Sequence, residues 1–184
     1  FISYTEEIEA KAMNSENLIY LFSSQPFSVF KVNSSKVELV NQDIEIFLKV
    51  NKQDGILSSI FRDTNINNFF EKAYDSFNEL DKKRVIEASN EINIEPSKSK
   101  DLKITNLKIE NDKISFFTNS PGELHLIKVS YFPNWTIANG KGPFRTSPSF
   151  MSVIPNQEYV EINFDKTSVE KNSFYFAIFS LLLS

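Results

Sequence analysis

The stretch Ile127–Trp135, IKVSYFPNW, and the residues that follow it at 138–155, ANGKGPFRTSPSFMSVIP, decide how the carboxyl-terminal half of the chain folds. The first stretch predicts a strand that ends at Pro133, because a proline ring has no N–H for the ladder, and then a turn that carries the single tryptophan. Gly140 and Gly142 predict a sharp loop. Prolines 143, 148 and 155 then punctuate a return strand, SFMSVIP.

Further short strands are expected on both sides of this motif. They are the apolar, alternating segments 102–109, 114–117, 124–129, 135–138, 149–154 and 158–164. Several short strands at close, regular spacing are typical of a β-sandwich, which we place at 101–172.

The amino-terminal part, 1–95, has a different pattern and predicts a lobe of mixed hairpin and helix. The expected elements are a polar helix within 5–17, a hairpin of 27–32 with 36–40 about the turn at 33–35, a half-buried strand at 44–50, and helices over 56–61 and 66–77. The polar segment 89–101, which contains Pro96, is the expected boundary between the lobes. The predicted fold class is therefore α+β, with an N-terminal mixed lobe and a C-terminal antiparallel β-sandwich.

The last residues, FYFAIFSLLLS at 174–184, are apolar on every face of a helix. They are too few to cross a bilayer, which needs about 20 residues. Two interpretations remain open: a buried terminal strand or helix, or the first part of a longer spanning helix. The polar residues just before the run favour the second, so 173–184 is predicted to start a transmembrane helix.

The motif SYFPNW, with the later residues Gly140, Pro143, Ser147, Pro148, Met151, Val153 and Pro155, resembles a known arrangement. It is similar to the carboxyl-terminal extracytoplasmic domain of polytopic membrane proteins described as 6-pyruvoyl-tetrahydropterin synthase-related, and more distantly to YfhO-type proteins. In those families a YxPxW turn precedes a Gly-containing loop, an apolar strand and a helix that returns to the membrane. The resemblance covers about 125–184, with weaker likeness over 18–50; the middle does not match.

The resemblance implies a noncatalytic domain on the extracytoplasmic side of a cell membrane, within a larger protein of glycosyltransferase-C-like architecture. Its implied partners are its own transmembrane domain and the lipid bilayer, with a glycan or lipid-linked sugar as a candidate ligand. The catalytic carboxylates of such enzymes lie in loops between membrane helices, outside this chain. Whether the parent protein is an enzyme stays open.

Composition narrows the chemistry further. The 184 residues have a net charge of −4, which gives no electrostatic reason to expect a nucleic-acid partner. Cysteine is absent and His125 is the only histidine, so neither a disulfide framework nor a histidine-rich metal site is expected, and no cofactor is predicted. Eighteen phenylalanines against four glycines suit strands around an aromatic core.

The ligand-binding candidates are Tyr131, Asn134, Trp135 and Arg145. Trp135 could stack on a sugar ring while Asn134 and Arg145 donate to hydroxyl groups, which defines the alternative function, a carbohydrate-binding β-sandwich. The competing interpretation is that Trp135 and Tyr131 pack the edge of the sandwich or rest at a membrane interface. Asn33 and Asn134 each begin an N-glycosylation sequence, and whether either is used is left open. No catalytic residue is predicted.

Overall fold

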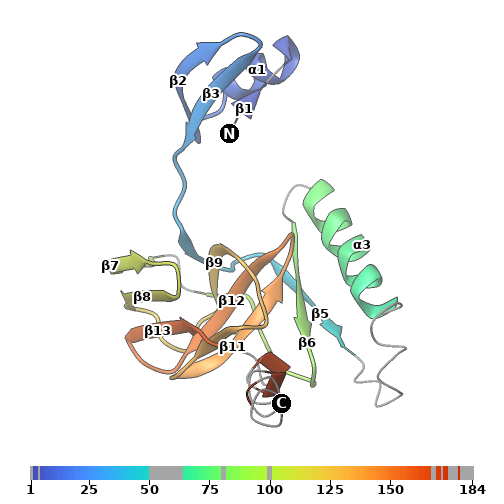
Figure 1. Cartoon of the computed structure of the whole chain (residues 1–184), viewed down its shortest axis with the longest axis vertical. Coiled ribbons are helices and arrows are strands. Elements are labelled where there is room, and N and C mark those ends of the chain that lie inside the picture. The colour runs from blue at the N-terminus through green and yellow to red at the C-terminus, as the bar shows by residue number, and fades with distance from the viewer. Residues whose placement is uncertain are drawn as a thin grey trace. The chain divides into compact units, whose positions relative to one another are not determined.

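The computed structural model of the chain describes residues 2–3, 5–49, 64–79, 82–98, 101–166, 169–170, 172–173 and 178. It is an α+β structure rich in antiparallel strands (Figure 1). The chain forms two compact units, Phe1–Lys36 and Val37–Ser184, which are described separately below.

The first unit is a three-stranded antiparallel sheet with one helix against it. Its elements are β1 (Ile2–Ser3), α1 (Glu6–Met13), β2 (Leu18–Ser24) and β3 (Phe27–Val32), with the strands in the order β1-β3-β2. The helix begins where sequence predicts, because the side chain of Thr5 accepts a hydrogen bond from the N–H of Ile8 and so caps the first turn. The helix lies over the sheet face that carries Phe30, which is buried.

The predicted hairpin of 27–32 with 36–40 is wrong. β3 pairs instead with β2, in a register that sets Leu18 opposite Val32 and Ser24 opposite Phe27. The strand at Val37–Leu39, β4, belongs to the second unit and pairs with a strand more than eighty positions further along the chain. The strands before and after the turn at 33–35 therefore pair with other strands and not with each other. The local sequence pattern of a strand does not determine which strand it pairs with.

The second unit contains a six-stranded sheet and a four-stranded sheet. The larger has the order β4-β9-β12-β11-β6-β5, and its remaining strands are β5 (Asp43–Leu48), β6 (Lys83–Ala88), β9 (His125–Ser130), β11 (Gly140–Thr146) and β12 (Phe150–Pro155). The smaller has the order β10-β13-β8-β7, formed by β7 (Ile104–Ile109), β8 (Lys113–Thr118), β10 (Trp135–Ile137) and β13 (Tyr159–Phe164). All pairs are antiparallel except β5 with β6, which α3 (Thr64–Asn78) connects.

The two sheets share one apolar core, as expected of a sandwich. The buried residues of this core come from both sheets: Val37, Ile114, Phe116, Ile127, Trp135, Met151, Val153, Val160 and Ile162. Alternation along β8 and β13 sends every second side chain into this layer, which is why these strands show a two-residue period in the sequence.

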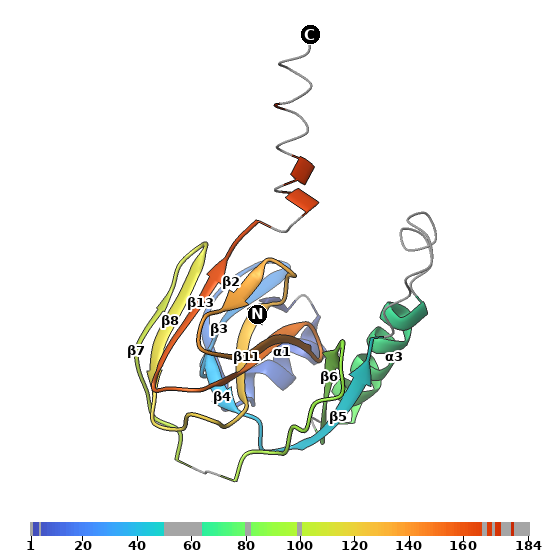
Figure 2. The same cartoon turned by 90° about the horizontal axis from the view of Figure 1, so that it is seen from below.

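One row of side chains crosses the larger sheet on a single face and shows how that face is covered. The register sets Ile127 opposite Met151, Met151 opposite Arg145, Arg145 opposite Glu87, and Glu87 beside Phe47. The first two contribute to the core with the smaller sheet. Phe47 packs on Phe69 of α3, with ring centroids 6.0 Å apart. The smaller sheet therefore covers one half of this face and α3 the other half (Figure 2).

The units divide between Lys36 and Val37, whereas the sequence predicted a division between 95 and 101. β4, β5, α3 and β6 all join the second unit because their strands extend the larger sheet. The polar segment expected as a boundary runs along this sheet instead. Ile94 packs against the cluster of Val40, Ile86, Leu124 and Leu126, and the N–H of Ser97 donates to Val40 O at 2.7 Å.

The predicted helix over 56–61 lies outside the described residues, as does all of the apolar run at 174–184 except Ile178. The predicted helix over 66–77 is present as α3. Within the part of the chain that the structure describes, no helix has both the length and the apolar character needed to cross a membrane.

Candidate functional site

The FPNW turn, Phe132–Trp135, connects the two sheets of the sandwich. β9 ends at Ser130, ahead of Pro133 as the sequence predicts, and the N–H of Trp135 donates to Phe132 O at 3.1 Å to close the turn. Trp135 then starts β10, which pairs with the end of β13 by setting Trp135 opposite Phe164. The turn therefore lies beside the point at which the chain leaves the sandwich.

Trp135 is a core residue. Its side chain is only 7% exposed, and its ring meets that of Phe164 edge to face at a centroid distance of 5.0 Å. Its Nε1–H is buried without a hydrogen-bond partner among the described residues. A sugar could stack on this indole only if the ring left the core, so the position of Trp135 does not support the sugar-stacking role and agrees with the structural interpretation.

Asn134 fixes the turn to the segment that follows β13. Its Nδ2 donates to Glu170 Oε2 at 2.9 Å, and its backbone O accepts from the N–H of Asp165 at 2.9 Å. Two exposed rings lie at the same end of the sandwich: Phe132 and Phe164, with centroids 6.3 Å apart. We call Phe132, Asn134, Phe164 and Glu170 the basal cluster. It presents exposed aromatic side chains next to residues 169–170 and 172–173, which are helical and precede the apolar run.

Arg145 lies on β11 in the larger sheet and has its contacts with α3 and β6, whereas Trp135 begins β10 in the smaller sheet. Its guanidinium carbon lies 4.9 Å from the ring centre of Phe69 and 4.3 Å from that of Phe70, both on α3. Its Nη1 is 3.6 Å from Glu87 Oε2. This arrangement satisfies the guanidinium by a carboxylate and two aromatic faces, which is a packing role.

Tyr131 stands between the two groups. It packs against the sandwich core, and its N–H donates to Ser149 O at 3.0 Å. Burial raises the pKa of its phenol; the charge of Glu87 acts in the same direction, and that of Arg145 opposes it. The structure thus places Tyr131 near Arg145, and Asn134 with Trp135, but it does not form one site from all four candidates.

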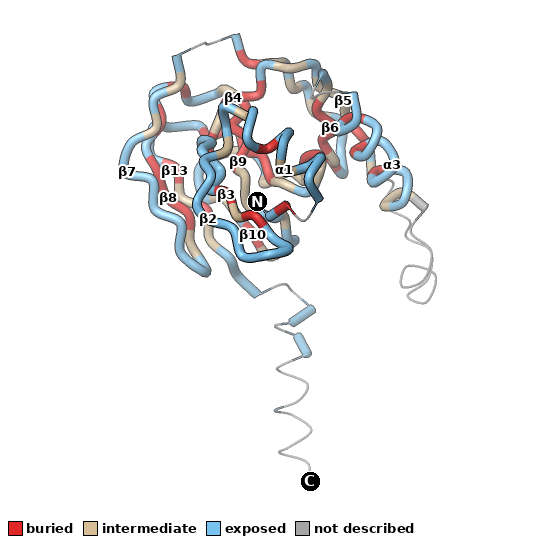
Figure 3. Tube along the Cα trace, turned by 90° about the horizontal axis from the view of Figure 1, so that it is seen from above, coloured by how far each residue is buried: buried red, intermediate tan, exposed pale blue. Residues whose placement is uncertain are grey.

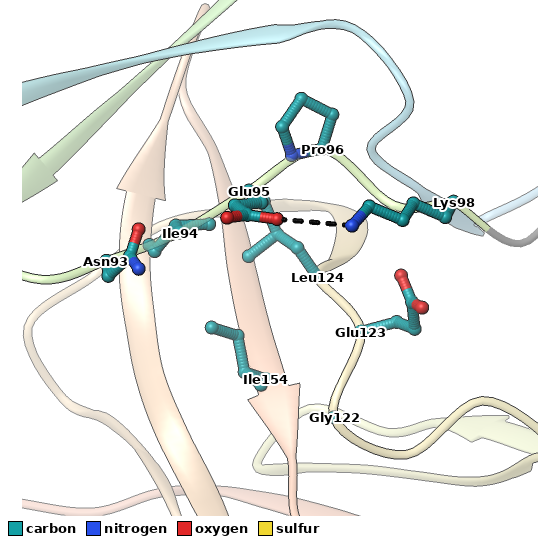
Figure 4. A pocket seen from close by; sticks show the side chains of 9 residues that line it. All are labelled: Asn93, Ile94, Glu95, Pro96, Lys98, Gly122, Glu123, Leu124 and Ile154. Carbon is teal, nitrogen blue, oxygen red and sulfur yellow. Dashed lines mark ion pairs between the residues drawn. The ribbon is translucent and has the colours of Figure 1, made fainter.

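A small pocket opens between the 93–98 segment and the turn before β9 (Figure 4). Its volume is about 280 Å³, and it is lined by Asn93, Ile94, Glu95, Pro96, Lys98, Gly122, Glu123, Leu124 and Ile154. Its charged groups are already satisfied: Lys98 lies 3.5 Å from Glu95, and Ser97 Oγ donates to Glu123. The pocket could hold a small polar molecule, but it contains no paired nucleophile and base.

His125 is fully buried in the sandwich, with its ring near that of Phe116, and both of its ring nitrogens are hydrogen-bonded. Nδ1 donates to Glu123 O at 2.8 Å, and in the neutral ring Nε2 accepts the hydrogen bond from Thr118 Oγ1, also at 2.8 Å. Burial lowers the pKa of the imidazole, which is therefore neutral. In the described ranges no group of three or more His, Cys, Asp or Glu residues is arranged to hold a metal ion.

The two glycosylation sequences lie in different environments. Asn33 is exposed and directly follows β3, whereas the side-chain amide of Asn134 is hydrogen-bonded to Glu170. Sequence reasoning missed Phe164, Glu170 and Glu87. The signal for Phe164 was its place at the end of an alternating strand shortly before the apolar run, while the other two depend on pairings that no local pattern shows.

The fold and these contacts define an α+β protein whose second unit packs two sheets around one apolar core. No protein-family model, curated protein sequence or solved structure matches the chain. Function is therefore argued from the chain's own residues.

Proposed function

We propose that the chain is a noncatalytic domain on the extracytoplasmic side of a polytopic membrane protein, with the basal cluster next to the bilayer and the apolar run 174–184 entering it. The observation that carries this proposal is the bond from Asn134 Nδ2 to Glu170 Oε2, which attaches the FPNW turn to the residues just before that run. The basal cluster would then lie close to the lipid headgroups, because Glu170 precedes the apolar run by only a few residues.

The chemistry of the basal cluster supports this placement. Phe132 and Phe164 are exposed, and exposed apolar rings of this kind suit the boundary between headgroups and acyl chains. Structural roles are favoured over catalysis for the charged and polar groups elsewhere in the second unit. Arg145 and Glu87 form an ion pair, and the neutral His125 is hydrogen-bonded at both ring nitrogens. A glycosyltransferase-like parent, suggested by the resemblance alone, would have its reactive carboxylates in other segments.

Single-cysteine labelling tests the membrane connection cleanly, because the chain has no cysteine of its own. An environment-sensitive fluorophore would be attached to Leu182→Cys or to the matched surface variant Asn119→Cys, and each full chain reconstituted into phosphatidylcholine vesicles. We expect blue-shifted emission and quenching by lipid-borne quenchers at position 182 only. Equal aqueous exposure of both labels would refute the membrane proposal.

The side of the membrane needs a separate test in the parent protein. Ser34→Cys places a thiol in the exposed segment that connects β3 to β4. In intact cells a membrane-impermeant maleimide should label this position. Labelling only after the cells are permeabilised would place the domain on the cytoplasmic side and overturn that part of the proposal.

A further inference from the structure

The sheet of the first unit has one covered and one bare face. α1 covers the face of Ser28 and Phe30, where Ser28 Oγ donates to Glu9 Oε1 at 2.7 Å. Because side chains alternate, Phe27, Val29 and Lys31 point to the opposite face. The register adds residues of the neighbouring strands to it: Ile2 and Phe22 opposite Val29, and Ile19 opposite Lys31.

The bare face is strongly apolar. We define it by Ile2, Ile19, Phe22 and Phe27, which are 61%, 47%, 54% and 49% exposed, with Lys31 on the same face. Figure 3 draws β2 in the exposed colour along nearly its whole length. Four large apolar side chains on one face of a three-stranded sheet form a contiguous patch, and such patches mark binding surfaces.

We infer that this bare face docks on a lipid bilayer that contains anionic headgroups. The inference rests on the proposed function, because the first unit is tethered to the chain that would enter the bilayer: only residues 33–36 connect β3 to β4. Two exposed phenylalanines beside aliphatic side chains suit the boundary between headgroups and acyl chains.

The charges of the unit favour a bilayer over other occupants. Glu6, Glu7 and Glu9 lie in the first turn of α1, on the covered side of the sheet, while Lys31 lies on the bare face. An anionic surface attracts the lysine and repels the acidic helix, so the bare face is turned toward it. Pairing of β2 with a second copy is disfavoured, because a bulge at Leu21 breaks the regular ladder along this edge strand.

The test attaches the same fluorophore to Phe22→Cys on the bare face or to Glu7→Cys on α1, in the full chain. Each labelled chain is placed, one copy per disc, in lipid nanodiscs of phosphatidylglycerol and phosphatidylcholine in equal amounts. We expect blue-shifted emission and lipid quenching at position 22 but not at position 7. Equal exposure of both labels to water overturns the inference.

The remaining outcomes are distinguishable. A shift at position 22 that is equally large in detergent without a bilayer means that the rest of the chain covers the face, and a shift that needs two copies per disc means self-association; either result overturns the inference. The Leu182→Cys reporter separates the two proposals. If position 182 is protected and position 22 is not, only the docking of the bare face is wrong.

The second measurement compares how two charge-reversal variants change the docking equilibrium. Lys31→Glu should lower the docked fraction in the anionic discs, with the docking equilibrium constant reduced about fivefold or more, because a lysine near an anionic surface contributes about 1 kcal/mol. Lys11→Glu is the matched control on α1, where Lys11 Nζ bonds Glu7 at 2.7 Å. Equal effects of the two substitutions would contradict the assigned orientation.

Discussion

Arg145 faces Glu87 across the neighbouring strands β11 and β6, with Nη1 3.6 Å from Oε2, and lies against the rings of Phe69 and Phe70. The Glu87 side chain is only 9% exposed. This pair stands where the cover of the larger sheet changes from the smaller sheet to α3. It therefore joins three elements that are distant in the sequence.

Replacing one partner of this ion pair should lower the free energy of unfolding more than replacing both. Arg145→Met is expected to lower the free energy of unfolding by about 3 kcal/mol, because it leaves the buried Glu87 carboxylate with the more distant Lys49, 3.7 Å away, as its ion-pair partner among the described residues. The double variant Arg145→Met/Glu87→Met should regain more than half of that loss. Urea unfolding measures both values.

The matched control is Lys128→Met. Its bond to Glu38 is more exposed, and its loss should cost less than about 1 kcal/mol. If the double variant is no more stable than Arg145→Met, or if the control costs as much, the pair does not act as a buried unit.

The contribution of Trp135 to stability should come from the volume of its ring and not from a hydrogen bond of its N–H. Since Nε1 has no partner, Trp135→Phe should cost only about 1 kcal/mol, whereas Trp135→Ala leaves a cavity in the sandwich core and should cost about 3–5 kcal/mol. Thermal unfolding of both variants decides. A Phe variant as unstable as the Ala variant would show that the indole N–H has a partner.

The sandwich strands were predictable because their period is local, while the missed elements depend on distant partners. β6, KRVIEA, follows α3 and does not alternate in the sequence, because consecutive residues on both of its faces are buried; it is a strand because it pairs with β5 and β11. β11 contains two glycines and a proline, which are typical of loops. The structure accommodates them with a bulge between Lys141 and Phe144, so the predicted loop at Gly140 and Gly142 is instead part of a strand.

The candidate site shows the same limit of local reasoning. The chemistry of Trp135 and Arg145 suits one sugar site, but their strands belong to different sheets. The burial of Trp135 followed from its residue type. The bond of Asn134 to Glu170 and that of Arg145 to Glu87 could not be predicted, since each joins segments whose register only the folded chain sets.

Gly142 is expected to tolerate no side chain. Its φ is +106°, and an added Cβ would lie 2.8 Å from Ser152 O and 3.1 Å from Phe144 N, both backbone atoms. Gly142→Ala should therefore cost about 2 kcal/mol or more through backbone strain and overlap.

Gly122 is the matched control for this substitution. Its φ of +85° would also strain an alanine, but nothing lies within 4 Å of an added Cβ. Gly122→Ala should cost only about 1 kcal/mol, from the positive φ alone. Chemical denaturation of the two variants separates strain from overlap, and equal losses would contradict the close approach of β11 to β12 at Gly142.

His125 should make the protein less stable in mild acid. Burial lowers its pKa in the folded state below the ordinary 6.5, so the unfolded chain binds a proton that the folded chain does not. The stability that the neutral imidazole contributes is complete above pH 6.5 and is lost as the pH falls below that value. The melting temperature should decline in this window, and His125→Gln should flatten the decline although it lowers stability at every pH.

A second acid-sensitive group acts in a different range and serves as the internal control. Bonds from Lys113, Tyr159 and Asn163 lower the pKa of the Glu161 carboxyl to about 2 from 4.5, so its contribution is lost only as the pH falls below 4.5. Glu161→Gln should leave the decline just below pH 6.5 unchanged. Because the chain has one histidine, its ring nitrogens can also be followed directly by NMR. At pH 7 they should show the neutral form protonated at Nδ1, since Nδ1 donates to Glu123 O. A charged imidazolium at this pH would contradict the hydrogen bond that Thr118 Oγ1 donates to Nε2.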